Sequence, residues 1–99
     1  MQPVPATIGD MPILYWTPID SRHRVTGACK HFDLSTNSKD PVPRAIAIVS
    51  GGGSNFYLIR RTEDWQFITD TWHESLDDAF GQAEFEYEGV TFTWQAVGT

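Results

Sequence analysis

Asp70, His73 and Glu74 form an acid–imidazole–acid cluster directly before a predicted helix. Two carboxylates and an imidazole can hold a metal ion or move a proton in acid–base catalysis. The spacing matches no zinc motif, because no second His follows the His73-Glu74 pair. Polar residues at this point can equally end a strand and start a helix. Two interpretations stay open: a strand-to-helix connection, or a small metal-binding or hydrolytic enzyme centred on these three residues.

The predicted helix carries acidic residues at both of its ends. Asp77 and Asp78 lie in the first turn, where the positive end of the helix dipole favours them. Glu84, Glu86 and Glu88 lie in the last turns, where the dipole is negative and each carboxylate is unfavourable. Glu84 and Glu88 are also a like-charged pair four residues apart. The helix by itself therefore does not explain its three glutamates.

Two explanations can account for these glutamates. In the first, Arg44, Arg60 or Arg61 of the predicted sheet pairs with them, or water solvates them. In the second, they bind a basic partner outside the chain. Phe85 lies among these acids, because its helical position points away from the predicted apolar face. Either the C-terminal strand covers it, or it is an exposed aromatic anchor ringed by carboxylates, as in a binding hot spot.

The first and last parts of the chain differ in charge. Residues 1–61 hold all seven Lys and Arg with four carboxylates, which gives +3, whereas residues 62–99 hold nine carboxylates and no base, which gives −9. An acidic surface steers basic molecules toward it and disfavours nucleic acid and anionic membranes. We therefore predict a binding protein rather than an enzyme, with no cofactor, no direct contact with nucleic acid and no membrane segment.

The length and composition predict one folded domain over residues 1–99. Aromatic residues make up 13% of the chain, and each can bury a large area, so a modest core can form. The single cysteine, Cys29, cannot form an internal disulfide, which favours a reducing compartment. The first residues lack the basic start and apolar stretch of a signal peptide. We expect a cytoplasmic protein.

Hydrophobic periodicity predicts a strand-rich chain with one helix. Apolar runs and alternation predict strands at residues 13–16, 24–34, 45–49, 56–60, 65–69 and 90–97, after an extended lead-in at 1–12 and around a loop at 35–43. The helix is predicted over residues 76–87, with Ser75 as N-cap and Gly89 beyond its end. The expected fold is α+β, with a mainly antiparallel sheet of four to six strands and the C-terminal helix packed on one face.

The segment Asp70-Thr-Trp-His-Glu-Ser-Leu-Asp-Asp-Ala-Phe-Gly-Gln-Ala-Glu-Phe-Glu-Tyr-Glu-Gly89 resembles a signature in small, acidic, mostly uncharacterised bacterial proteins. The Phe-Tyr-Leu-Ile and Trp-Gln-Phe-Ile strands before it are similar too, so the likeness covers roughly residues 55–94. In size and acidity such proteins are similar to the immunity proteins that neutralise bacterial toxins. The resemblance implies a compact α+β protein, and it assigns no catalytic residue.

The sequence as a whole predicts an immunity or inhibitor-type protein that docks an acidic surface on a basic partner, such as a toxin or a nucleic-acid enzyme. A small metal-binding or hydrolytic enzyme is the alternative, and a structural or assembly subunit is a further one. The expected partner-binding residues are Asp77, Asp78, Glu84, Phe85, Glu86 and Glu88.

Overall fold

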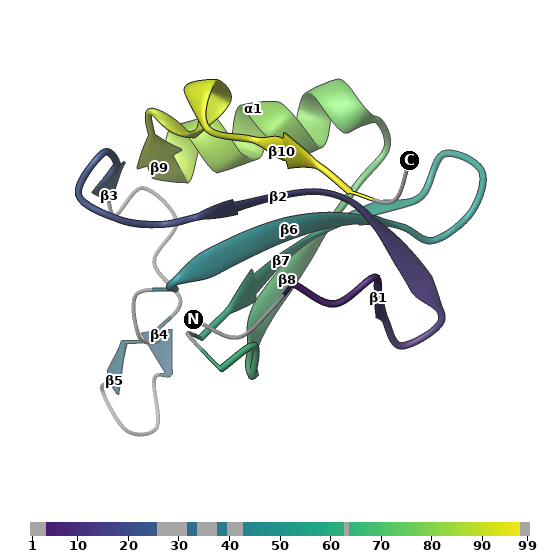
Figure 1. Ribbon diagram of the computed structural model, residues 1–99, viewed down its shortest axis with the longest axis horizontal. Helices are drawn as coiled ribbons and strands as arrows, with labels where there is room; N and C mark the ends of the chain where they lie inside the picture. The colour runs from purple at the N-terminus through teal and green to yellow at the C-terminus, as the bar shows by residue number, and fades with distance from the viewer. Residues whose placement is uncertain (1–3, 26–31, 34–37, 40–42, 63, 98–99) are drawn as a thin grey trace.

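An antiparallel sheet forms the body of the protein, and one helix lies along one of its faces (Figure 1). The computed structural model describes residues 4–25, 32–33, 38–39, 43–62 and 64–97. Its elements are β1 (Thr7–Ile8), β2 (Met11–Pro18), β3 (Arg24–Val25), β4 (Phe32–Asp33), β5 (Ser38–Lys39), β6 (Ala45–Ser50), β7 (Phe56–Arg61), β8 (Phe67–His73), α1 (Leu76–Glu86), β9 (Tyr87–Glu88), the 3-10 turn η1 (Val90–Phe92) and β10 (Gln95–Ala96). The α+β prediction agrees with this arrangement.

The main sheet has six strands in the order β1-β2-β6-β7-β8, with β10 also paired to β2. The strands β6, β7 and β8 follow one another as an antiparallel meander, as the short connections predicted. The central strand β6 is apolar on both faces, and residues 45–49 are all fully buried. A strand with two buried faces needs a layer on each side of the sheet.

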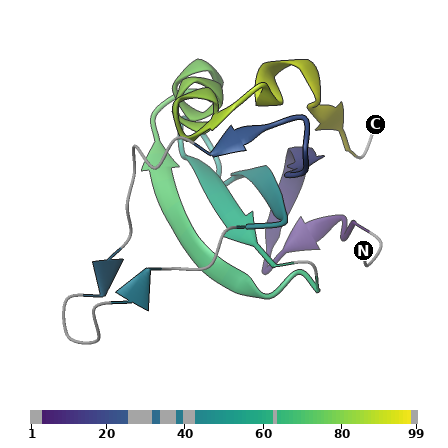
Figure 2. The same ribbon diagram turned by 90° about the vertical axis from the view of Figure 1, so that its left-hand side faces the viewer.

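The two layers of the core follow from the alternation along the strands. Ile46, Ile48 and Leu58 face α1 and pack against its small residues Ala79 and Ala83. The opposite face carries a second cluster, in which Ile13, Ala47, Val49 and Ile59 are buried. This second face lies inside the curve of the sheet, where the N-terminal segment lies across it (Figure 2).

The helix begins and ends close to where the sequence predicts. The Ser75 hydroxyl accepts the backbone N–H of Asp78 at 3.0 Å, which is the predicted N-cap bond. The last helical residue is Glu86, one residue before the predicted end. Within the described ranges, no helix combines the length and apolar character that a bilayer crossing needs.

The region before β6 differs from its prediction. Within the predicted strand over residues 24–34, β3 and β4 are strands, and residues 26–31 and 34, with Cys29 among them, lie outside the described residues. The predicted loop at 35–43 contains β5, which pairs with β4. The predicted lead-in at 1–12 contains β1 and the start of β2. Short strands of two residues carry almost no periodic signal, so pattern analysis misses them.

The predicted strand over residues 90–97 is wrong for its first half. Gly89 has a left-handed φ of 104°, and η1 follows it, so that only residues 95 and 96 form a strand. The turn closes through backbone bonds from Phe92 to Gly89 O at 3.2 Å and from Thr93 to Val90 O at 2.9 Å. Alternating residue types fit a strand, but these local bonds and side chains from other elements select a turn.

Candidate functional site

The cluster predicted at Asp70, His73 and Glu74 does not form in the fold. Asp70 and Glu74 are exposed, whereas the His73 side chain is buried and bonds to neither of them. Its ring nitrogens instead contact Thr71 Oγ1 at 2.7 Å and Asp78 Oδ2 at 2.6 Å. Among the described residues, no group of three or more His, Cys, Asp and Glu is placed to hold a metal ion. The structure therefore gives the trio no metal-binding geometry.

The Thr71–His73–Asp78 chain has the order of a hydroxyl, an imidazole and a carboxylate. That order can activate a hydroxyl nucleophile when the hydroxyl faces substrate. Here the Thr71 hydroxyl lies 3.5 Å from the buried Arg60 guanidinium, and His73 is only 5% exposed. The chain joins the end of β8 to the first turn of α1. Its geometry is that of a brace, which holds the start of the helix to the sheet.

A buried ion pair fixes the other end of α1 to the sheet. Arg60 donates from Nε to Glu86 Oε1 at 3.0 Å and from Nη2 to Glu86 Oε2 at 2.5 Å. Gln82 donates a further bond to Glu86 at 2.6 Å, and Arg60 also reaches Leu58 O at 3.2 Å. Both charged groups are therefore bonded on several sides, as a buried pair requires.

The ion pair changes the pKa values of Arg60 itself and of the neighbouring Tyr87. Burial alone would lower the pKa of Arg60, but the hydrogen bond and charge of Glu86 outweigh burial and raise it. Burial, together with the nearby Glu86 carboxylate, raises the pKa of Tyr87 to about 12. The phenol of Tyr87 and the guanidinium of Arg60 therefore keep their protons throughout the physiological range.

Glu86 was expected on the partner-binding surface, and its position is a correction. Its side chain is 3% exposed, so it cannot contact a partner directly. The sequence held a signal for this: Glu86 is seven residues after Ala79 and three after Ala83, which places it on the buried stripe of the helix. Likewise, alternation along β7 places Arg60 on the same face as Leu58. The internal explanation, pairing with an arginine of the sheet, is the one observed for Glu86.

Glu84 acts as a side-chain clamp on the turn that follows the helix. Its Oε2 accepts the Gly89 N–H at 2.9 Å, and its Oε1 accepts the Thr91 N–H at 3.0 Å and the Thr91 hydroxyl at 2.7 Å. Partial burial raises the pKa of Glu84, but these backbone and hydroxyl bonds outweigh that effect and lower it. The bonds offset the unfavourable position of this carboxylate at the negative helix end.

The other predicted partner-binding residues are exposed. Glu88 lies 3.6 Å from Arg24 in an ion pair at the surface. Asp77, Asp78 and Phe85 lie on the solvent side of α1, and Phe85 is 59% exposed. Asp78 also binds His73, so its carboxylate has a structural role as well. Whether these residues bind a partner stays a prediction.

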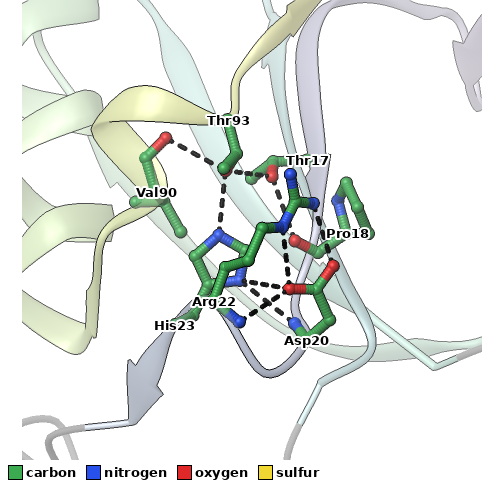
Figure 3. Close-up of polar contacts among 7 residues, drawn as sticks. All are labelled: Thr17, Pro18, Asp20, Arg22, His23, Val90 and Thr93. Atoms are coloured by element: carbon green, nitrogen blue, oxygen red, sulfur yellow. Dashed lines mark hydrogen bonds and ion pairs between the residues drawn. The ribbon is translucent and has the colours of Figure 1, made fainter.

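A second histidine, His23, bonds to Thr93 at the end of the same turn (Figure 3). His23 Nδ1 accepts the Asp20 backbone N–H at 3.0 Å, so the proton sits on Nε2 and is donated to Thr93 Oγ1 at 2.9 Å. Thr93 contacts Thr17 Oγ1 at 2.6 Å, and Thr17 donates to Pro18 O at 3.0 Å. This chain of bonds joins the C-terminal segment to β2 and to the loop that follows it.

The loop beyond β2 is itself fixed by an ion pair. Asp20 accepts two bonds from the Arg22 guanidinium, at 3.0 and 2.9 Å, and one from the Arg22 backbone N–H. These bonds, with the side-chain bond first in weight, lower the pKa of Asp20 to about 2. The carboxylate therefore stays charged at physiological pH, and the loop that supplies His23 keeps its shape.

The turn held between Glu84 and His23 presents Phe92 to solvent. Phe92 is 89% exposed, the highest value among the large apolar side chains of the described residues. The sequence left open that the C-terminal strand covers Phe85, but at Phe92 that strand is replaced by the 3-10 turn. The cover of the core is Trp94, whose ring packs against Phe80 at 5.2 Å. No alternation pattern marks Phe92 as exposed, because its direction depends on the turn.

Polar groups thus anchor α1 and η1 at three places: His73 at the start, Arg60 near the end, and Glu84 with His23 at the turn. Burying this many polar groups is unfavourable unless their partners are fixed, so the arrangement specifies one position for the helix. We define the helix–turn surface as five exposed side chains: Asp77, Asp78 and Phe85 of α1, Glu88 of β9 and Phe92 of η1.

Comparison with protein-family models, with characterised proteins and with solved structures finds no match for this chain.

Proposed function

We propose that this protein binds a basic partner protein through the helix–turn surface, in the manner of an inhibitor or immunity protein. One observation carries the proposal: Phe92 is 89% exposed on a turn whose first and last residues, Gly89 and Thr93, are both bonded to side chains outside it. A large exposed aromatic is unfavourable in water, and a loose turn could fold it inward. Here the bonds of Glu84 and Thr93 hold it outward.

A fixed aromatic is the kind of residue that contributes most to protein–protein affinity. Such anchors fill a pocket on the partner, and a rigid anchor loses little conformational entropy on binding. In this protein the turn is positioned before any partner arrives, because its polar bonds are internal. Phe92 therefore supplies affinity, and the bonds around it supply preorganisation.

The charge of the surface supports a basic partner. Asp77 and Asp78 are exposed in the first turn of α1, Glu88 is exposed just beyond its last residue, and residues 62–99 contain no Lys or Arg. Arg24 lies near Glu88, at 3.6 Å, and neutralises part of that charge. The remaining carboxylates would steer a basic surface into place and fix its orientation. Nucleic-acid enzymes and toxins that act on nucleic acid present such basic surfaces.

The test is capture from the native host on immobilised protein, followed by kinetics with the purified partner. Replacing Phe92 by Ala should weaken binding by about 30-fold or more, mainly through faster dissociation, as for a hot-spot residue. Phe92→Tyr keeps the ring and should stay within about threefold. Asp77→Asn combined with Glu88→Gln should slow association and flatten its salt dependence.

Urea unfolding of every variant must first show parental stability, so that lost binding is not lost folding. If Phe92→Ala binds as tightly as the parent, the helix–turn surface is not the docking site. If the charge variants associate as fast as the parent at low salt, the partner is not recognised through its positive charge.

A further inference from the structure

Among the described strands, β8 lies at an edge of the main sheet. Among the described residues its strand partner is β7, whereas β2 near the other edge is paired with β1 and β10 as well as β6 (Figure 1). In the turned view β8 runs along the outside of the curved sheet (Figure 2). An edge strand exposes backbone N–H and C=O groups that can pair with another extended chain.

Proteins usually protect such edges with lysine, proline, a bulge or a short strand. The seven residues of β8 include neither Lys nor Pro, and the register shift of the β7–β8 pair lies near its start. From Thr69 to His73 the register with β7 runs without interruption. This edge therefore has the length and regularity that strand addition needs.

Three β8 side chains share the face that points away from α1. Phe67, Asp70 and Trp72 pair across the ladder with Arg61, Ile59 and Tyr57, which alternate along β7. Phe67 is 58% exposed and Trp72 is 53% exposed. The edge therefore presents a carboxylate between two aromatic side chains.

Neighbouring residues hold these aromatic side chains in place. The Trp72 indole N–H donates to Asn55 Oδ1 at 3.0 Å, and the Arg61 guanidinium lies 5.7 Å from the Phe67 ring centre. Arg61 also donates to Trp65 O at 2.9 Å. The Asp70 carboxylate acts electrostatically on the nearby Arg61, but no ion pair of Asp70 is formed within the described part of the chain.

Asp70 discriminates between possible occupants of the edge. It is the middle residue of β8, so a second copy paired antiparallel about the strand centre would place Asp70 against Asp70. Like charges directly opposite each other destabilise a strand pair, whereas opposite charges stabilise it. A segment with Lys or Arg opposite Asp70 is favoured, and self-association through this edge is disfavoured.

We propose that β8 accepts an extended basic segment of another protein as an added antiparallel strand. Backbone bonds along residues 67–73 would hold the segment, a Lys or Arg would face Asp70, and its apolar side chains would pack on Phe67 and Trp72. This site is separate from the helix–turn surface and does not depend on the function proposed above.

The test uses three synthetic nine-residue peptides of alternating Thr and Val that differ in defined ways. One has Arg at its centre, one has Glu there, and the third repeats the Arg peptide with alternate backbone amides N-methylated on one edge. Amide hydrogen exchange of the labelled protein, followed residue by residue, reports protection along β8, and titration at low salt gives the affinities. We expect the Arg peptide to protect residues of β8 and to bind about tenfold more tightly than the Glu peptide. The methylated peptide should not bind.

Charge variants then assign the preference to one residue. Asp70→Asn should abolish the discrimination between the Arg and Glu peptides, and Asp70→Lys should reverse it. Asp10→Asn, which removes an exposed carboxylate between β1 and β2, and Phe92→Ala should leave it unchanged. The proposal is overturned if no peptide protects β8, if the methylated peptide binds equally, or if the Asp70 variants keep the parental preference. Concentration-dependent dimerisation through β8 would make a second copy the occupant and overturn it as well.

Discussion

Breaking the Arg60–Glu86 pair tests the account of how α1 is held to the sheet. In Glu86→Leu the leucine fits an apolar neighbourhood, but Arg60 stays buried and loses its carboxylate partner. Its remaining partners are uncharged: Leu58 O at 3.2 Å, the distant Thr71 hydroxyl at 3.5 Å and the Tyr87 phenol. Leaving one buried charge without its partner destabilises a protein by about 3–5 kcal/mol. Because domains of this size unfold with about 5–15 kcal/mol, the variant should lose a large part of its stability.

Urea unfolding followed by tryptophan fluorescence measures this loss. With a slope near about 2 kcal/mol per molar urea, a loss of about 4 kcal/mol moves the midpoint down by about 2 M. Arg60→Met should lose a similar amount, since it leaves the Glu86 carboxylate buried. The double variant, Arg60→Met with Glu86→Leu, should recover most of the loss, because two matched apolar side chains replace a buried pair at little net change.

Glu88→Leu is the matched control. Glu88 sits two residues from Glu86, but its partner Arg24 lies 3.6 Å away with both side chains largely exposed. Exposed ion pairs contribute about 0–1 kcal/mol, so this variant should unfold close to the parental midpoint. A loss of less than about 1 kcal/mol in Glu86→Leu, or a double variant as unstable as the two single losses added together, would show that the buried pair does not hold α1 in this way.

Three further predictions concern the turn that carries Phe92. Gly89→Ala should lower stability by about 1–2 kcal/mol or more, because φ is 104° and an added Cβ would lie 2.9 Å from Arg22 O. Gly81→Ala, with open space around its Cβ, should instead gain about 0.5–1 kcal/mol. Thermal unfolding distinguishes the two outcomes. Hydrogen bonding lowers the pKa of Glu84 in the folded state, so its contribution to folding stability is present above its ordinary pKa near 4.5 and is lost as pH falls through the folded value. The difference in unfolding free energy between the parent and Glu84→Gln should therefore close on acidification. A difference that widens would contradict this. Thr93→Val keeps the shape of the side chain but leaves His23 Nε2–H without its acceptor, so it should cost about 1–3 kcal/mol in urea unfolding; no measurable loss would show that the hydroxyl chain does not hold the turn.

Local sequence signals determined the elements that carry the surface. Ser75 and the apolar spacing of the helix defined α1, because an N-cap bond and a 3.6-residue period involve only neighbouring residues. The apolar run of β6 and the short connections after it defined the meander for the same reason. The pairing of Glu86 with Arg60 was among the stated alternatives, and combining the two periodicities would have selected it.

Which polar groups meet, and which aromatic side chain faces solvent, depends on how the helix packs on the sheet. Arg60 and Glu86 are 26 residues apart, and His23 and Thr93 are 70 apart, so their contacts exist only once the helix packs on the sheet. The bonds of Glu84 and Thr93 turned an apparently alternating segment into a 3-10 turn and placed Phe92 outside it. Alternation describes what a segment favours in isolation, whereas the hydrogen bonds to Glu84 and to His23, acting together, set its final conformation.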